Sequence, residues 1–177
     1  MKLLGSAPTG RLARRLGAYV TDCLILFAGI LVSQGLILAI GLNPLATHPD
    51  GTEPGASLQA WVFVTVTIPC VLYFAAFHAG SRGATPGKRW LGLRVVGTAG
   101  GQPGIVRALA RSAITLLPFE WNHLVVALFV ADSSAPLAWA GLALTYAAVF
   151  AYLACVLLDH QGRSPADRLA STRVIVL

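Results

Sequence analysis

Long apolar runs are the feature that most constrains this chain. Residues 23–42, 58–77 and 136–158 contain no charged side chain. A hydrocarbon core about 30 Å thick is crossed by roughly 20 residues of helix. Charged types make up only 11 % of the sequence, whereas soluble domains carry about 25 %. The runs therefore exclude a disordered chain, a coiled coil and an ordinary soluble enzyme, and they predict a protein that crosses the membrane several times.

A fourth run, residues 112–131, is apolar but is interrupted by Glu120, Asn122 and His123. The basic residues decide whether it crosses. All thirteen Lys and Arg lie in three clusters, at residues 2–15, 82–111 and 163–173. Four crossings place every cluster on one side of the membrane, whereas three would export the last cluster. Because basic residues stay in the cytoplasm, we expect four crossings with both termini cytoplasmic.

The sequence thus predicts an all-α membrane protein with a single domain, residues 1–177. Its four transmembrane helices are expected at about residues 19–42, 58–78, 108–131 and 136–158. A cytoplasmic loop, 79–107, and a cytoplasmic tail, 159–177, complete the chain. The loop segment 90–96 and the tail segment 172–177 are strand candidates, and we expect them to pair as a small cytoplasmic β-element. Pro69 is expected to kink the second span.

Small residues follow one another at i+4 spacing in the fourth span. Ala143, Ala147, Ala151 and Cys155 form this stripe, and small residues let helices approach closely. We interpret the stripe first as packing within the chain. The alternative is a contact between copies in a homo-oligomer.

Several functional classes lack support in the sequence. The net charge of +6 is explained by residues that flank the spans, so no nucleic-acid partner is expected. The segment 83–89 does not match a phosphate-binding loop, because Arg82 and Arg89 stand where Gly and Ser or Thr are needed. No cysteine or histidine spacing suggests a metal, and no nucleophile motif is present. We expect no enzyme, no cofactor and no metal.

Charged residues from both ends of the chain are expected to meet at the cytoplasmic face. Arg15 and Asp22 are seven residues apart on one helix face, and the tail brings Asp167 to the same side of the membrane. A carboxylate at this depth requires a partner or water. Two interpretations remain open: a clasp that fixes the tail to the first span, and the inner mouth of an ion pathway.

Glu120 is the most suggestive single residue, because a carboxyl group in the middle of a span is costly to ionise. His123 follows three residues later on the same helix face, so the two could pass protons or hold a cation. The alternative is a third span that is not fully inserted. In the loop and the start of the third span, five basic residues are candidates for contact with anionic lipid or a partner protein: Lys88, Arg89, Arg94, Arg107 and Arg111.

Three ordered stretches carry a family resemblance: residues 14–22 (RRLGAYVTD), 83–96 (GATPGKRWLGLRVV) and 164–174 (SPADRLASTRV). Together they resemble the RDD family of membrane proteins, and the resemblance spans nearly the whole chain. It implies that Arg15, Asp22 and Asp167 are the residues that name the family, and that Arg111 is similar to a family arginine. Ser171, Pro165 and Ala166 depart from the usual pattern, and Glu120 matches no family motif.

The resemblance implies more about identity than about activity, since most members have no assigned function and some resemble cation/proton antiporters. One hypothesis is therefore a small secondary transporter, a homo-oligomer that exchanges Na⁺ or K⁺ for H⁺. The other is a scaffold or accessory subunit that presents a basic cytoplasmic face. The expected location is the inner membrane of a bacterial-type cell.

Overall fold

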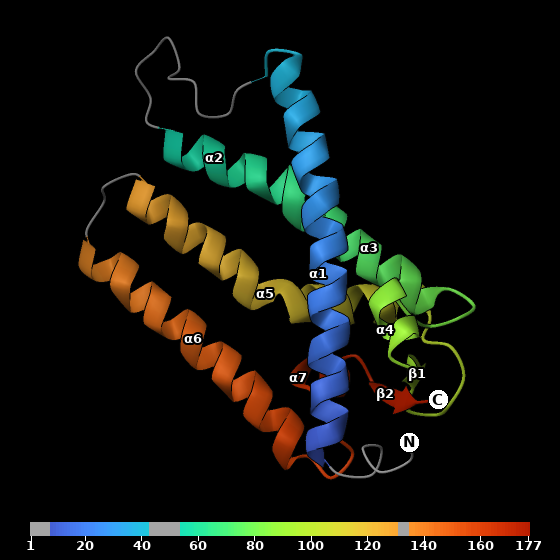
Figure 1. Cartoon of the computed structure of the whole chain (residues 1–177). Helices are drawn as coiled ribbons and strands as arrows, with labels where there is room; N and C mark the ends of the chain where they lie inside the picture. Colours follow the sequence, from blue (N-terminus) through green and yellow to red (C-terminus); the bar gives the residue numbers. More distant parts are fainter. Residues whose placement is uncertain (1–7, 43–53, 131–134) are drawn as a thin grey trace.

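The computed structural model describes residues 8–42, 54–130 and 135–177. Within these ranges, four helices are long and apolar enough to cross a membrane, at Gly10–Ala39, Leu58–Ala79, Ile105–Phe129 and Pro136–Leu158 (Figure 1). They confirm the predicted multi-pass helical architecture. Residue 131, the predicted end of the third span, lies outside the described residues. The first helix begins earlier than predicted, because its basic amino-terminal part is helical as well.

The first two spans differ in regularity. Helix α1 (Pro8–Ala39) is continuous. The second span is built from α2 (Pro54–Val62), a π-helical turn η1 (Phe63–Thr67) and α3 (Ile68–Ala79). The turn ends just before Pro69, which has no N–H and whose ring crowds the preceding turn. A wider turn accommodates such a ring, so Pro69 accounts for the interruption of this span.

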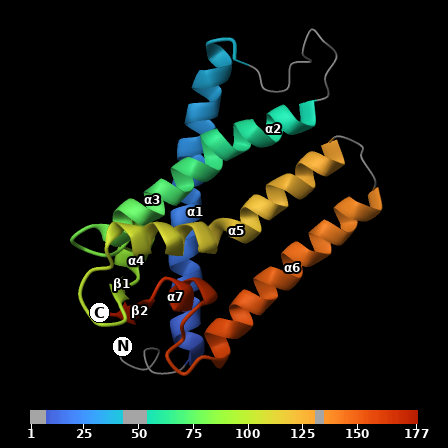
Figure 2. The ribbon, with the colours of Figure 1, turned by 180° about the vertical axis from the view of Figure 1, so that it is seen from behind.

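The third and fourth spans are the single helices α5 (Ile105–Val130) and α6 (Ala135–Leu158). Pro118 lies inside α5, and the helix changes direction near its middle (Figure 2). A proline in a helix interior removes one main-chain hydrogen bond and kinks the helix. Helix α5 packs against α3 on one side and α6 on the other, so it is the central helix of the bundle.

Four short elements gather at the end of the bundle where α1 begins, which we call the terminal end (Figure 1). They are α4 (Pro86–Trp90), β1 (Leu93–Gly97), α7 (Pro165–Leu169) and β2 (Thr172–Val176). The strands pair antiparallel, with Leu93 opposite Val176 and Gly97 opposite Thr172. The predicted β-element is confirmed. It leans on α4 and α7, as a two-stranded sheet must lean on other structure.

The alanine stripe of α6 does not pack inside the chain. Ala143, Ala147 and Ala151 are exposed, whereas Gly141 and Thr145 are buried. At Gly141 an added Cβ would lie 2.7 Å from Val125 Cγ2 of α5. The interpretation as packing within the chain was therefore wrong: α6 meets α5 through the neighbouring face, because glycine allows the closer approach there.

Candidate functional site

Asp22 fastens the loop to the first span. Its side chain is buried, with 0 % exposure. The carboxylate accepts hydrogen bonds from the Gly87 N–H at 2.8 Å, from the Tyr73 hydroxyl at 3.2 Å and from the Thr85 hydroxyl at 2.5 Å. A Cβ at Gly87 would lie 2.3 Å from the Ala18 carbonyl oxygen. Glycine is therefore required for α4 to sit on α1 with its first turn against Asp22.

Asp167 fastens the tail. It closes a capping box on α7, accepting hydrogen bonds from the Ser164 N–H at 3.1 Å and the Ser164 hydroxyl at 2.9 Å. Arg111 Nε lies 3.0 Å from one carboxylate oxygen, which also accepts the Thr172 hydroxyl at 3.1 Å. Burial alone would raise the pKa of Asp167, but Arg111 and Arg15 outweigh it and lower the pKa to about 2. This carboxyl group is held ionised.

Arg15 joins the first span to the tail. Its guanidinium lies 3.7 Å from Asp167 and donates to the carbonyl oxygens of Gly162 and Val174, the latter at 3.2 Å. The predicted meeting of Arg15 and Asp167 therefore occurs in the structure. Among the described ion pairs, Asp22 faces Lys88 at 4.0 Å and not Arg15. The predicted single cluster is thus two neighbouring clusters, one on α4 and one on α7.

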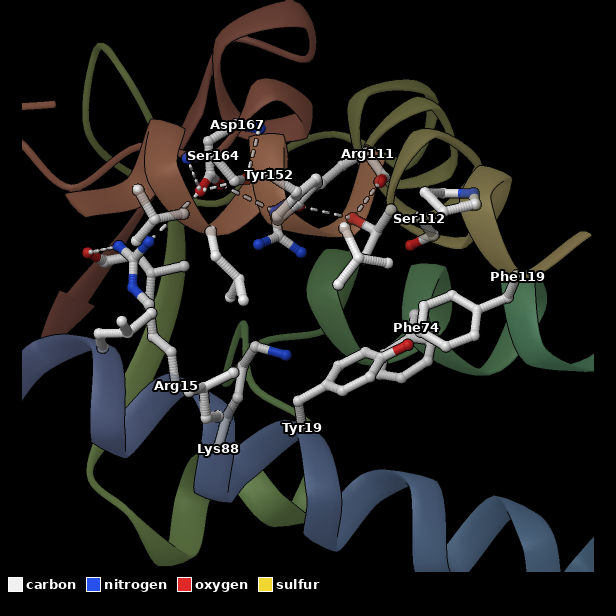
Figure 3. A pocket seen from close by; sticks show the side chains of 18 of the residues that line it. Arg15, Tyr19, Phe74, Lys88, Arg111, Ser112, Phe119, Tyr152, Ser164 and Asp167 are labelled. Atoms are coloured by element: carbon white, nitrogen blue, oxygen red, sulfur yellow. Dashed lines mark hydrogen bonds and ion pairs between the residues drawn. The ribbon is translucent and has the colours of Figure 1, made fainter. Parts of the chain in front are cut away.

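A cavity of about 200 Å³ lies between these clusters and the spans (Figure 3). Lys88 and Arg111 enter it from opposite sides, and both are buried, with exposures of 8 % and 6 %. Both were predicted to contact lipid or a partner at the surface. The structure places them inside, because α4 folds back onto α1 and α7 covers the start of α5. Of the five predicted contact residues, Arg89 and Arg107 are exposed and Arg94 is half-buried.

Glu120 lies further along the bundle, between the second and third spans. One carboxylate oxygen accepts the Gln59 amide N–H at 2.7 Å, and the other accepts the Thr67 hydroxyl. The His123 ring nitrogen Nδ1 lies 3.5 Å from the second oxygen. The predicted pairing of Glu120 with His123 is therefore present, and the side chains keep exposures of 20 % and 35 %. Among the described ion pairs, no Lys or Arg faces this carboxylate.

A second cavity of about 190 Å³ is lined by Glu120, His123 and Thr67. Tyr19, Phe74 and Phe119 line both this cavity and the first one. The Tyr19 ring stacks on the Phe74 ring with centroids 6.0 Å apart, and the Phe119 ring lies 6.0 Å from Tyr19. These three aromatic side chains form a layer between the cavity at the terminal end and the cavity at Glu120.

Comparison with known proteins identifies the family. The model of the RDD family matches residues 9–171, which is nearly the whole chain. The chain belongs to the RDD family. No curated protein and no solved structure matches it significantly. The RDD match includes the first two stretches that carry the resemblance in the sequence and residues 164–171 of the third.

Arg15, Asp22 and Asp167, the residues that the sequence resemblance implies are typical of the family, have a definite place in the structure. Arg15 and Asp167 hold the tail, and Asp22 holds the loop, all at the terminal end. Arg111 binds Asp167 directly. None of these residues contacts Glu120 through a described hydrogen bond or ion pair. The RDD residues and Glu120 are separate sites.

Some partners of these acids were not predicted. Two had a usable signal: Ser164 stands three residues before Asp167, a capping-box pattern, and Thr85 before Pro86 is a helix start. Both residues cap helices in the structure: the Thr85 side chain accepts a hydrogen bond from the Lys88 N–H, and Ser164 forms a capping box with Asp167. Gln59 and Thr67 had no such signal, because only the packing of α2 and η1 against α5 brings them to Glu120.

Proposed function

We propose that this RDD protein is a small secondary transporter that exchanges a monovalent cation, such as Na⁺ or K⁺, for protons. Glu120 carries the exchange: it holds a proton in one state and a cation in the other. The observation that carries the proposal is the surroundings of its carboxylate. The described partners are a neutral amide, a hydroxyl and an imidazole, and a carboxylate without a fixed positive partner can accept a mobile one.

The neighbours of Glu120 also supply the oxygen ligands that hard cations prefer. Besides the carboxylate, the Thr67 hydroxyl oxygen is in contact. The Gln59 side-chain oxygen is buried and has no hydrogen-bond partner among the described residues. Rotation of the Gln59 amide by half a turn would exchange its N–H group for this oxygen. Three oxygen-bearing side chains would then surround a cation.

His123 offers a place for the proton. An imidazole nitrogen can accept or donate a proton, and Nδ1 of His123 is 3.5 Å from the carboxylate. The 190 Å³ cavity beside both residues gives room for ions and water. The aromatic layer of Tyr19, Phe74 and Phe119 separates this cavity from the one at the terminal end, so exchange requires that the layer opens.

The test is proton movement in reconstituted vesicles that contain a pH-sensitive dye. Gradients of Na⁺, K⁺ and Li⁺ are imposed in turn on wild type and on Glu120→Gln. We expect a cation-dependent pH change that falls at least tenfold in Glu120→Gln. Asp159→Asn is the matched control, because it makes the same chemical change in the tail, where Asp159 pairs with Arg163 and Arg168. No flux from folded wild type with any cation would contradict the proposal.

We further propose that the transporter is a homo-oligomer, since four spans enclose little space. The outward face of α6 with Ala143, Ala147 and Ala151 supports this proposal, because small residues allow close helix contact. A cysteine introduced at Ala147 should then form a disulfide between two copies. The Tyr146→Cys variant, which is exposed but lies about 100° around α6 from Ala147, should not.

A second candidate function is a non-transporting scaffold that presents a basic face to a partner or to anionic lipid. The carboxylates of Asp22 and Asp167 favour this function, because their hydrogen bonds are all made to the loop, the tail and the spans and so serve assembly of the terminal end. Arg89 and Arg107 are exposed there. Under this function, Arg89→Glu with Arg107→Glu should weaken binding to vesicles that contain phosphatidylglycerol, and Glu120→Gln should have no effect.

A further inference from the structure

The cavity at the terminal end has more positive than negative charge in its lining. Arg15, Lys88 and Arg111 line it, against the single carboxylate of Asp167. That carboxylate is already engaged, since it accepts hydrogen bonds from Arg111, Ser164 and Thr172. When Asp22, whose carboxylate lies 4.0 Å from Lys88, is counted as well, three basic side chains face two carboxylates, so one positive charge is left without a counter-charge.

Lys88 is the clearest example of a positive charge in this cavity that lacks a close partner. Its side chain is only 10 % exposed, and the nearest carboxylate oxygen, on Asp22, is 4.0 Å from its ammonium nitrogen. It lies 5.5 Å from the centre of the Phe74 ring, which is an attractive contact but no hydrogen bond. No described residue accepts a hydrogen bond from its Nζ atom. Burial of a cation without an acceptor is costly, so the site is incomplete as the chain alone builds it.

Arg111 faces the same cavity and has one hydrogen-bond donor without a partner among the described residues. Its Nε donates to Asp167 at 3.0 Å, and its Nη1 lies 3.5 Å from His78 Nδ1. The other terminal nitrogen, Nη2, has no hydrogen bond to a described residue. Figure 3 shows the guanidinium of Arg111 and the ammonium of Lys88 directed into the cavity toward each other. Two buried donors therefore converge on one space without an acceptor between them.

We propose that this cavity binds a phosphate-type oxyanion between the Lys88 ammonium and the Arg111 guanidinium. The anion is either inorganic phosphate or the phosphate of an anionic lipid headgroup, which share the recognised chemistry. Nη2 of Arg111 is the guanidinium donor that Asp167 and His78 leave free, and the Lys88 ammonium adds a compact point charge. A volume of about 200 Å³ is several times the share of one water molecule, about 30 Å³.

This site goes beyond cation exchange and does not depend on it, because the aromatic layer separates it from Glu120. A bound anion would neutralise the lining at the terminal end. It would also stabilise the fold there, since Lys88 lies on α4 and Arg111 on α5. A ligand that bridges two elements of the native state favours that state.

The protonation of Lys88 provides a readout. Burial lowers the pKa of Lys88 to about 7, and Arg111 acts in the same direction, while Asp22 and Asp167 oppose both and Arg15 lowers it further. An anion next to the amine favours the charged form and raises the pKa. Lys2 and Lys88 are the two lysines of the chain, so selective ¹⁵N-lysine labelling gives two side-chain signals.

The first experiment follows the Lys88 signal against pH in the full-length protein, with Lys2 as internal reference. In neutral detergent we expect a midpoint near pH 7 that rises by about 1 unit when inorganic phosphate is added. In nanodiscs, phosphatidylcholine alone is compared with a mixture that contains phosphatidylglycerol. A rise with phosphate identifies a free oxyanion, and a rise only with the anionic lipid identifies a headgroup. An unchanged midpoint in both series would overturn the proposal.

The second experiment uses variants. By calorimetry, with whichever anion raised the midpoint, Lys88→Gln should bind about tenfold more weakly or worse, as expected for a lost charged hydrogen bond. Lys88→Arg should retain binding. Arg82→Gln removes an exposed charge from the same loop and should bind as wild type does. Wild-type affinity in a folded Lys88→Gln protein would contradict the site.

Discussion

Two sets of carboxylates in this protein have opposite surroundings. At the terminal end, Asp22 and Asp167 have 0 % exposure, and each accepts at least three hydrogen bonds from loop, tail or span. Asp167 also faces two arginines. Glu120 keeps 20 % of its side chain exposed beside a cavity. Its described partners are neutral groups and one imidazole.

This difference in partners distinguishes the carboxylates that hold the fold together from the carboxylate proposed to exchange ions. A carboxylate whose lone pairs are filled by fixed donors and fixed charges cannot release them without unfolding its surroundings. A carboxylate with neutral partners has no permanent counter-ion and can take up a proton or a cation instead. The comparison therefore assigns stability to Asp22 and Asp167, and under the proposed function it leaves Glu120 as the group that exchanges ions.

The largest expected effect comes from Asp167. Asp167→Asn leaves Arg111 and Arg15 without their buried counter-charge, which should cost about 3–5 kcal/mol of unfolding free energy. Thermal unfolding in detergent measures the loss. Asp159→Asn in the tail is the comparison, and its loss should be smaller, because its partners Arg163 and Arg168 keep 31 % and 50 % of their side chains exposed. Equal losses in both variants would remove the distinction between a carboxylate with buried arginine partners and one with part-exposed partners.

Acid should weaken the terminal end before it affects the spans. The folded-state pKa of Asp167 is about 2, and the unfolded value is about 3.9. A lowered pKa stabilises the fold above the unfolded value, and the stabilisation is lost as pH falls through the folded value. We expect about 2 kcal/mol to be lost from pH 5 to pH 2. The loss should be absent in a folded Asp167→Asn protein, and unfolding followed against pH checks it.

Gly87→Ala tests the contact between α4 and α1. The new Cβ would meet the Ala18 carbonyl and the Asp22 carboxylate, so we expect a loss of about 1–3 kcal/mol. Gly29→Ala is the control. Gly29 lies on α1, the other helix of this contact, and nothing lies within 4 Å of a Cβ added there. That change should be neutral or slightly stabilising. Chemical denaturation of both variants measures the difference, and a neutral Gly87→Ala would show that α4 can move away from Asp22.

The smallest expected change in stability lies at Glu120. Thr67→Val removes one hydrogen bond to the carboxylate, and such bonds inside membranes average about 0.6 kcal/mol. The cation concentration for half-maximal exchange should nevertheless rise several-fold, because an oxygen ligand is lost. Vesicle flux against cation concentration measures this. A large loss of stability with unchanged flux would place Thr67 in the framework.

Much of the fold could be predicted because it follows from patterns along the chain. Apolar runs gave the spans, the basic clusters gave their number, and the alternating segment 90–96 gave one strand. The contact between Arg15 and Asp167 could be predicted because the charged amino-terminal part of the chain and the charged tail were both placed at the same face of the membrane. These inferences need only the thickness of the bilayer and the position of charges.

The errors concern which face of an element meets its neighbour. Lys88 and Arg111 were expected at the surface and are buried, because their charge is visible in the sequence but the fold of α4 over α1 is not. The alanine stripe of α6 was expected inside and is exposed, since Gly141 gives an even closer contact. Gln59 and Thr67 reach Glu120 through packing across the bundle, which leaves no local pattern.

The most direct measurement compares the cation-driven proton flux per folded molecule in two variants, Glu120→Gln and Asp22→Asn. Each is purified, its folded fraction is determined by thermal unfolding, and its cation-driven proton flux is measured in vesicles. The account predicts that Glu120→Gln keeps its stability and loses flux, while Asp22→Asn loses folded protein and keeps flux in the molecules that remain folded. The reverse pattern, with flux lost at Asp22 in stable protein and retained at Glu120, would contradict it.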